Sequence, residues 1–218
     1  MSKYRLILNL SRPISHRASA MSTPFDQRRL ILASTSPFRR ELLARLGLPF
    51  AVRAPEVDES PLTGEAAPAL VARLAELKAR FVAEREPAAL VIGSDQVAVL
   101  DGEIIGKPGD HQRAAAQLRR ASGRAVVFQT GVCLFDSASG ERQVAVERFG
   151  VVFRALTPAM IERYLRREQP YHCAGSFKSE GLGIALFERL EGDDPTGLIG
   201  LPLIRLTRML EAAGMPVL

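Results

Sequence analysis

The sequence has few of the residues from which proteins build metal centres and disulfide frameworks. Its 218 residues include two cysteines without CxxC spacing, Cys133 and Cys173, and three histidines that do not cluster, His16, His111 and His172. A metal site built on thiolates is therefore not expected. Two isolated cysteines indicate free thiols in a reducing compartment, so we expect a cytoplasmic protein.

The chain also lacks an uninterrupted run of 18 apolar residues, so no membrane-spanning helix is expected. Hydrophobic residues make up 47% and charged residues 24% of the sequence, the proportions of a globular protein with a substantial core. No internal repeat or low-complexity linker divides the chain. The length therefore indicates one domain, or one domain with two lobes.

Acidic residues are absent from the first twenty positions, which carry four basic residues. Subtracting these four charges from the net charge of +5 leaves +1 for the remainder, so a groove for a nucleic acid polymer is not expected. Residues 1–26 are interpreted as a disordered extension. Two alternatives are a transit peptide and a start assigned too early, with translation beginning at Met21. The functional domain is expected to span residues 27–218.

Residues 34–40, which join a short apolar strand to a helix, are the most informative segment. Ser36 is the expected N-cap, and Pro37 suits the first helical position because it has no N–H to lose. Free backbone N–H groups and the helix dipole attract anions at such a turn. Hydroxyl and guanidinium donors then complete a candidate phosphate cradle made of Ser34, Ser36, Arg39 and Arg40. The alternative is an ordinary capped surface helix.

Hydrophobic periodicity predicts the remaining elements. Strands are expected over residues 29–33, 49–53, 89–93, 125–135, 143–153 and 184–190, with a hairpin over 97–105 around Asp101 and Gly102. Helices are expected over residues 37–47, 67–84, 110–122 and 158–168, and from residue 203 onward, with a loop over 191–200. This order indicates an α/β protein with a mixed sheet.

Asp95 is the strongest catalytic candidate, because it follows the buried strand 89–93 and open α/β sheets bind ligands at the carboxyl ends of strands. The acidic loop 55–60 follows the preceding strand and supplies three further carboxylates, Glu56, Asp58 and Glu59. Such oxygen ligands suit Mg²⁺ or Mn²⁺, which take one or two carboxylates together with substrate phosphates. The alternatives are a turn residue at Asp95 and a solvated acidic loop.

Two lysines, Lys78 and Lys107, are candidates for neutralising phosphate oxygens, although Lys78 also suits the surface of an amphipathic helix. Together with the carboxylates and the phosphate cradle they suggest metal-assisted attack of water on a polyphosphate. In this hypothesis a carboxylate serves as the general base.

Five motifs, in this order and spacing, resemble those of the Maf family of nucleoside triphosphate pyrophosphatases. They occupy residues 34–40, 56–59, 93–97, 106–108 and 200–202. The resemblance extends from residue 29 to the C-terminus. It implies a mixed, largely antiparallel, twisted sheet with flanking helices, in two lobes around a cleft, related to inosine triphosphate pyrophosphatases. It also implies a homodimer that splits a nucleoside triphosphate into the monophosphate and pyrophosphate with a divalent metal, Asp95 being the proton acceptor.

Within this family, residues 94–97, 173–181 and 186–190 resemble the 7-methyl-GTP branch. The resemblance assigns base selection to Phe38, Gln96 and Glu180. This is chemically reasonable, because N7-methylguanine is a cation that an aromatic face and a carboxylate both attract. Two alternatives stay open: a pyrophosphatase for dTTP, UTP or a wider set of modified nucleotides, and a nucleotide-binding regulator of septum formation or cell division.

Overall fold

The computed structural model describes residues 28–218, and the predicted extension over residues 1–26 lies outside them. The strands are β1 (Arg29–Ala33), β2 (Phe50–Arg53), β3 (Ala89–Leu100), β4 (Glu103–Ile105), β5 (Ala125–Asp136), β6 (Arg142–Phe153) and β7 (Phe187–Glu191). The α-helices are α1 (Pro37–Ala44), α2 (Ala67–Ala83), α3 (His111–Ala121), α4 (Pro158–Glu168), α5 (Pro195–Ile199) and α6 (Leu203–Ala212). Two short 3₁₀ helices, η2 (Ala174–Ser176) and η3 (Leu182–Leu186), precede β7. Among the described residues, no helix combines the length and apolar character that crossing a membrane requires.

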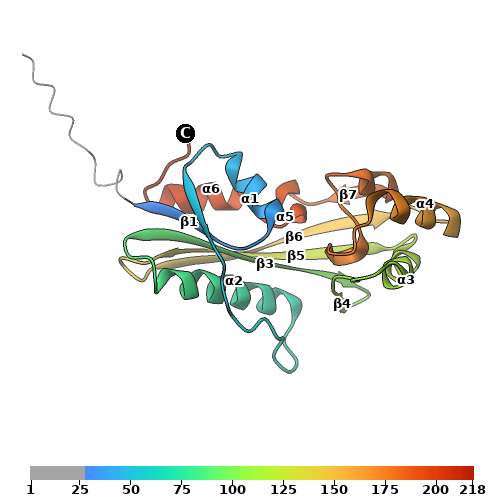
Figure 1. Cartoon of the computed structure of the whole chain (residues 1–218), viewed down its shortest axis with the longest axis horizontal. Helices are drawn as coiled ribbons and strands as arrows, with labels where there is room; N and C mark the ends of the chain where they lie inside the picture. The colour runs from blue at the N-terminus through green and yellow to red at the C-terminus, as the bar shows by residue number, and fades with distance from the viewer. Residues whose placement is uncertain (1–27) are drawn as a thin grey trace, which may run out of the picture.

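The strands form one seven-stranded sheet in the order β2-β1-β3-β5-β6-β7, and β4 pairs with β3 off this path (Figure 1). β2 and β3 run parallel to β1. All other neighbouring strands are antiparallel. The prediction of a mixed, largely antiparallel sheet with flanking helices is confirmed.

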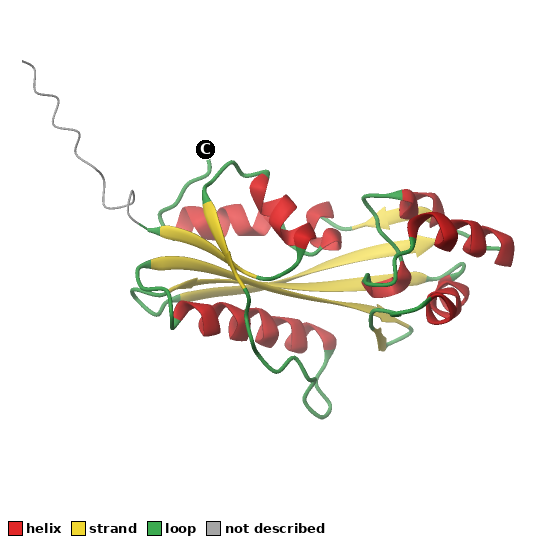
Figure 2. Ribbon diagram, in the orientation of Figure 1, coloured by secondary structure: helices red, strands yellow, loops and turns green. Residues whose placement is uncertain are grey.

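Helices cover both faces of this sheet: α2 lies along one face, and α1 and α6 lie on the other (Figure 2). Side chains alternate between the faces of a strand. In β1, Leu30 and Leu32 therefore belong to the core under α1 and α6, whereas Ile31 and Ala33 pack toward α2. A strand buried on both faces reads as a continuous apolar run, as β1 does.

Two glycines allow α2 to lie unusually close to the sheet. A Cβ atom at Gly93 of β3 would lie 2.0 Å from the carbonyl oxygen of Ala75, and one at Gly131 of β5 would lie 2.2 Å from that of Val71. Only the absence of a side chain permits these contacts. The close approach sets the depth at which the side chains of α2 meet the residues that follow Gly93 in β3.

A second core lies at the other end of the long strands, under α3 and α4. Four phenylalanines form its centre, with edge-to-face contacts at centroid distances between 4.9 and 5.6 Å: Phe128, Phe153, Phe177 and Phe187. This core is separate from the clusters packed around β1. The molecule therefore has two lobes that share the strands β3, β5 and β6.

Three sequence predictions are wrong in detail. β3 continues to Leu100 and does not end at residue 93, because β5 pairs with it along residues 90–100. Asp95 consequently lies in the middle of a long strand and not at its carboxyl end. Residues 195–199 form α5 inside the predicted loop, and residues 184–186 belong to η3 and not to the last strand.

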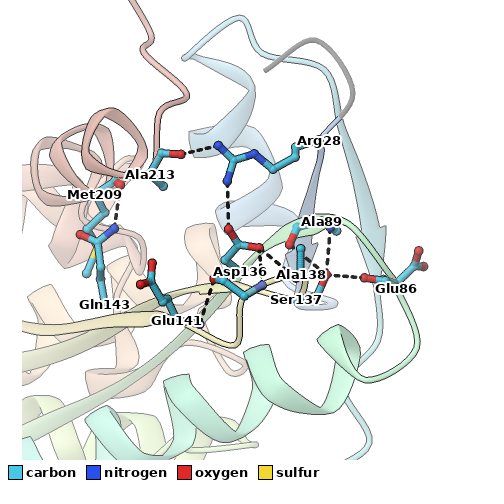
Figure 3. A network of polar contacts seen from close by, with 11 residues as sticks. Arg28, Glu86, Ala89, Asp136, Ser137, Ala138, Glu141, Gln143, Met209 and Ala213 are labelled. Atoms are coloured by element: carbon cyan, nitrogen blue, oxygen red, sulfur yellow. Dashed lines mark hydrogen bonds and ion pairs between the residues drawn. The ribbon is translucent and has the colours of Figure 1, made fainter. Parts of the chain in front are cut away.

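A polar network fixes the turn between β5 and β6 (Figure 3). The guanidinium of Arg28 donates to the Asp136 carboxylate at 2.9 Å and to the carbonyl of Ala213, after α6, at 2.6 Å. The hydroxyl of Ser137 accepts a hydrogen bond from the Ala89 N–H at 2.9 Å. The network thus joins the first described residue, the β5–β6 turn and the end of α6.

Candidate active site

A cleft of about 810 Å³ is lined by residues of both lobes. One wall comes from the β1–α1 turn, α2 and β3, and the other comes from the end of β4 and the segment 169–180. Ten of the predicted site residues line it: Ser34, Ser36, Phe38, Arg39, Glu59, Lys78, Asp95, Gln96, Lys107 and Glu180. The tertiary structure therefore gathers most of the predicted site into one cavity.

An open strand edge forms the floor of this cleft. β1 ends at Ala33, opposite Gly93, and β4 pairs with β3 from Ala98 onward. In the described part of the chain, residues 94–97 of β3 thus have no strand partner on that side. Asp95 lies on this edge, beside the carboxyl end of β1, which is the position where open α/β sheets bind ligands.

Asp95 is paired with a lysine of α2 inside the cleft. The Nζ atom of Lys78 lies 2.6 Å from Oδ1 of Asp95, and the two side chains are 5% and 11% exposed. The same ammonium lies 3.0 Å from Oε1 of Glu59, whose side chain is 56% exposed at the mouth of the cleft. Lys78 belongs to α2, the helix that packs against the bare backbone of Gly93. This close packing of α2 on β3 brings Lys78 within reach of Asp95.

The donor set at this point suits a hard divalent cation. Oδ1 of Asp95 and Oε1 of Glu59 lie 2.6 and 3.0 Å from the same Lys78 ammonium, so the two carboxylates are close to each other. Within residues 28–218, no group of three or more His, Cys, Asp or Glu side chains has the geometry of a complete metal site. Mg²⁺ and Mn²⁺ typically take one or two carboxylates and complete their shell with water and substrate phosphates, so the two carboxylates fit such an ion.

The predicted N-cap is present at the β1–α1 turn. Ser36 accepts a hydrogen bond from the Arg39 N–H at 3.4 Å, and the Ser34 hydroxyl accepts one from the Ser36 N–H at 3.1 Å. Pro37 occupies the first turn, which contains no acidic residue. The positive end of α1 therefore faces the cleft, as anion binding requires.

Arg39 is held by a carbonyl from the far end of the sequence. Its Nε donates to the carbonyl oxygen of Gly200 at 2.8 Å, and the Ser94 hydroxyl donates to the same oxygen at 2.9 Å. Burial lowers the pKa of Arg39, whereas the carboxylates of Asp95 and Glu59 raise it. The guanidinium remains charged at neutral pH and lies close to both carboxylates. It is therefore positioned to bind an anion at the N-terminus of α1.

Gln96 faces the other side of the strand, toward α5. Its Nε2 lies 2.7 Å from the carbonyl of Gly197, 3.1 Å from that of Leu198 and 2.9 Å from the hydroxyl of Thr130. The Thr130 hydroxyl itself donates to Gly197, so all three partners accept from the Gln96 amide. The amide nitrogen thus donates its hydrogen bonds to groups of the protein. The amide oxygen is the group that Gln96 can offer to a ligand.

Asp194 organises these carbonyl groups, and the sequence interpretation missed it. It is 5% exposed and accepts hydrogen bonds from the N–H of Thr196 at 3.0 Å, from the hydroxyl of Thr196 at 2.5 Å and from the N–H of Ile204 at 2.8 Å. It thus caps α5 and holds the start of α6. An Asp followed directly by Pro195 is a recognisable helix start, which is the signal that identifies it.

Three further predicted residues, Phe38, Lys107 and Glu180, line the cleft. Phe38 is half-buried in the first turn of α1, and Lys107 is exposed just after β4. Glu180 is exposed in the segment between η2 and η3, where it accepts a hydrogen bond from the Ser179 hydroxyl at 3.2 Å. The cleft thus combines the Asp95–Lys78 ion pair with an aromatic side chain at Phe38 and a carboxylate at Glu180.

Three predicted site residues, Arg40, Glu56 and Asp58, do not line the cleft. All three are exposed. Asp58 accepts a hydrogen bond from the Ser60 N–H at 2.9 Å, and hydrogen bonds from Ser60 lower its pKa. Of the three carboxylates in the acidic loop, Glu59 alone lines the cleft.

The two cysteines differ in position. Cys133 is fully buried, and desolvation raises its pKa to about 12. Cys173 lines the cleft, but desolvation also raises its pKa, so its thiolate is disfavoured. Neither thiol is therefore in an environment that favours a nucleophilic thiolate.

Comparison with known proteins places these features in context. The family model described as Maf-like protein matches residues 29–213. A protein of Nitrosococcus oceani named 7-methyl-GTP pyrophosphatase is 63% identical over 87% of this chain and 95% of its own length. Proteins of the same name from Albidiferax ferrireducens and Vibrio cholerae are each 57% identical, over 91% and 87% of this chain and 99% and 97% of their own lengths. A solved structure, the Ham1 protein of Staphylococcus aureus, aligns with a TM-score of 0.42 and 16% identity over 58% of this chain and 72% of that one.

Proposed function

Because the chain belongs to the Maf-like protein family, we propose that it is a pyrophosphatase that hydrolyses 7-methyl-GTP to 7-methyl-GMP and pyrophosphate. The structural observation that carries this proposal is the buried pair of Asp95 and Lys78 beside the anion-binding turn of α1, within one cleft. The high identity to relatives of that name supports the choice of nucleotide.

The geometry suits attack of water on the α-phosphorus. Asp95 accepts the proton of the attacking water, a new P–O bond forms, and the bond between the α-phosphorus and the bridging oxygen breaks. Pyrophosphate leaves with that bridging oxygen. The serine hydroxyls of the β1–α1 turn, the positive end of α1 and Arg39 hold the phosphates, and Lys78 and Lys107 supply positive charge.

Glu59 and Asp95 would hold a divalent cation, which when bound neutralises charge on the phosphate oxygens. The choice between Mg²⁺ and Mn²⁺ belongs to the proposal. Glu56 and Asp58, the other predicted metal candidates, point to no position in the cleft. We therefore propose Glu59 as the acidic-loop residue that contributes to metal binding.

The selective part of the cleft suits a cationic base. Phe38 offers an aromatic face, and Glu180 offers a carboxylate that accepts hydrogen bonds from the base and attracts its positive charge. The amide oxygen of Gln96 provides a further acceptor. Unmethylated GTP lacks the positive charge, so we expect it to be used less well by about tenfold, equivalent to ~1.4 kcal/mol.

A substrate panel tests the proposed function directly. Pyrophosphate release is measured with Mg²⁺ or Mn²⁺ for 7-methyl-GTP, GTP, dTTP, UTP and CTP. We expect the highest kcat/KM for 7-methyl-GTP. Preference for dTTP or UTP would retain the pyrophosphatase but contradict the roles of Phe38 and Glu180, and binding without turnover of any nucleotide would favour a regulator.

Arg39→Lys is expected to raise KM for the preferred nucleotide about tenfold, since one charge-assisted hydrogen bond is typically worth about 1.5 kcal/mol or more. A lysine has a single donor group and cannot bind the Gly200 carbonyl and a phosphate with the fork geometry of arginine. Steady-state kinetics of the purified variant give this value. Arg40→Lys is the matched control, because Arg40 is exposed and outside the cleft, and it should keep the wild-type KM. Equal effects of both substitutions would contradict the placement.

Glu59→Gln is expected to weaken binding of Mn²⁺ about tenfold or more, the usual loss when a metal site loses one supporting carboxylate contact. Calorimetric titration of Mn²⁺ in the presence of a non-hydrolysable triphosphate analogue measures the affinity without turnover. Glu56→Gln, from the same loop, is the control and should bind Mn²⁺ like the wild type. An equal loss in the two variants would show that the loop acts only through its overall charge.

We further propose that the enzyme is a cytoplasmic homodimer without a nucleic acid polymer or a membrane as partner. The resemblance to the family supports the dimer, and the two unpaired cysteines support a reducing compartment. Light scattering on the purified protein tests the first expectation, and a monomer at working concentrations would contradict it.

A further inference from the structure

The turn that carries Glu180 is held at both ends by one helix, α4. At its start, the N–H of Lys178 donates to the hydroxyl of Tyr164 at 3.1 Å. At its end, the N–H of Leu182 donates to the carboxylate of Glu168 at 2.8 Å. Tyr164 and Glu168 are four residues apart and therefore project from the same face of α4.

The backbone of this turn is tightly closed. The N–H of Gly183 donates to the carbonyl of Lys178 at 3.0 Å, and a Cβ atom at Gly183 would lie 2.2 Å from that oxygen. A Cβ atom at Gly181 would lie 2.9 Å from Oε2 of Glu168, so the Glu168 carboxylate rests against the backbone next to Glu180. The position of Glu180 thus depends directly on α4.

Glu168 also binds the side chain of Lys178, at 3.3 Å between Oε1 and Nζ. Lys178 and Glu180 both line the cleft, whereas Glu168 does not. Burial raises the pKa of the Cys173 thiol most; among the charged side chains, Glu180 and Glu168 raise it further, whereas Lys178 and Lys107 lower it. Lys178 and Glu180 are two residues apart in the turn, so an ammonium group that no other carboxylate held would be free to pair with Glu180.

We propose that Tyr164 and Glu168 are positioning residues for base selection: they hold the turn that presents Glu180, and Glu168 keeps the Lys178 ammonium away from that carboxylate. The inference rests on the proposed function, because it concerns discrimination between a cationic and a neutral guanine. Neither residue lies in the cleft, so each acts through the turn. Without Glu168, Lys178 pairs with Glu180 and repels the methylated base.

The test compares kcat/KM for 7-methyl-GTP with that for GTP in four proteins: wild type, Glu168→Gln, Lys178→Met and the double variant. Glutamine keeps the acceptor for the Leu182 N–H but loses the charge that binds Lys178. We expect E168Q to lower the selectivity ratio about tenfold, chiefly through KM for 7-methyl-GTP and with kcat unchanged, because GTP lacks the positive charge that a Lys178–Glu180 pair would repel. Adding K178M should restore the ratio, which a merely structural role would not explain.

Glu162→Gln is the matched control, because Glu162 lies on the same helix but binds His111 and Arg166. It should leave the ratio unchanged. An unchanged ratio in E168Q, or a lowered ratio that K178M does not restore, would overturn the inference. If E168Q does not fold, Tyr164→Phe removes only the acceptor for the Lys178 N–H, and an unchanged ratio there would also overturn it. A wild type without preference for 7-methyl-GTP would contradict the proposed function and not the contacts of α4.

Discussion

Asp95→Asn is expected to lower kcat for the preferred nucleotide by about 10²–10⁴-fold, the usual contribution of a positioned general base. Asparagine has the same shape but accepts no proton from the attacking water. It also leaves the Lys78 ammonium with Glu59 as its remaining carboxylate partner in the site. Because Glu59 is largely exposed and adaptable, we expect the variant to fold.

Pyrophosphate release under saturating nucleotide measures this loss, and circular dichroism monitors the fold. Asp101→Asn is the matched control: it lies in the turn after β3 and pairs with Arg124 on the surface. Asp101 has a positive φ of 52°, which asparagine tolerates, so this control should keep full stability and activity. Full activity of Asp95→Asn would show that another group accepts the proton.

Gly93→Ala is expected to lower the free energy of unfolding by about 3 kcal/mol, at the upper end of the usual cost of overpacking. The added methyl would lie 2.0 Å from the carbonyl oxygen of Ala75 and 2.8 Å from the backbone nitrogen of Ala79. Backbone atoms inside a helix cannot move aside individually, so α2 must shift as a body. Lys78 moves with it, and a displacement of about 1 Å at a catalytic group can cost about 10² in rate.

Urea unfolding followed by far-ultraviolet circular dichroism measures the stability, and pyrophosphate release measures the rate. Gly106→Ala is the control for stability, because a Cβ atom there meets no heavy atom within 4 Å and the backbone needs no positive φ. It should unfold like the wild type. If Gly93→Ala lost activity without losing stability, the close approach of α2 would serve the site alone.

The start of α1 could be predicted well from the sequence, because its signals are local. A short apolar strand, an N-cap serine and a proline in the first helical turn act within a few residues, so Ser36 could be assigned from the residues alone. The acidic loop was harder. Its three carboxylates look alike in sequence, and only the approach of Glu59 to Lys78 distinguishes it from Glu56 and Asp58.

Asp95 lines the cleft although the element that suggested it was predicted incorrectly. The sequence suggested a strand end at Gly93, but the strand continues because β5 pairs along its whole length. The strand that ends there is its other neighbour, β1, and the edge of β3 that this leaves unpaired lines the cleft. The β3–β5 pairing joins residues between 26 and 46 positions apart, which local patterns do not report.

By itself the sequence determined the mixed α/β fold class and the capped turn before α1, because periodicity and capping are local properties. The tertiary structure decided which of two adjacent arginines faces the cleft, since Arg39 meets the distant carbonyl of Gly200 and Arg40 does not line the site. It also decided that α2 packs directly against the backbone of Gly93, which brings Lys78 within 2.6 Å of Asp95. Such contacts join residues far apart in the chain, and their geometry exists only once the sheet and its helices have packed.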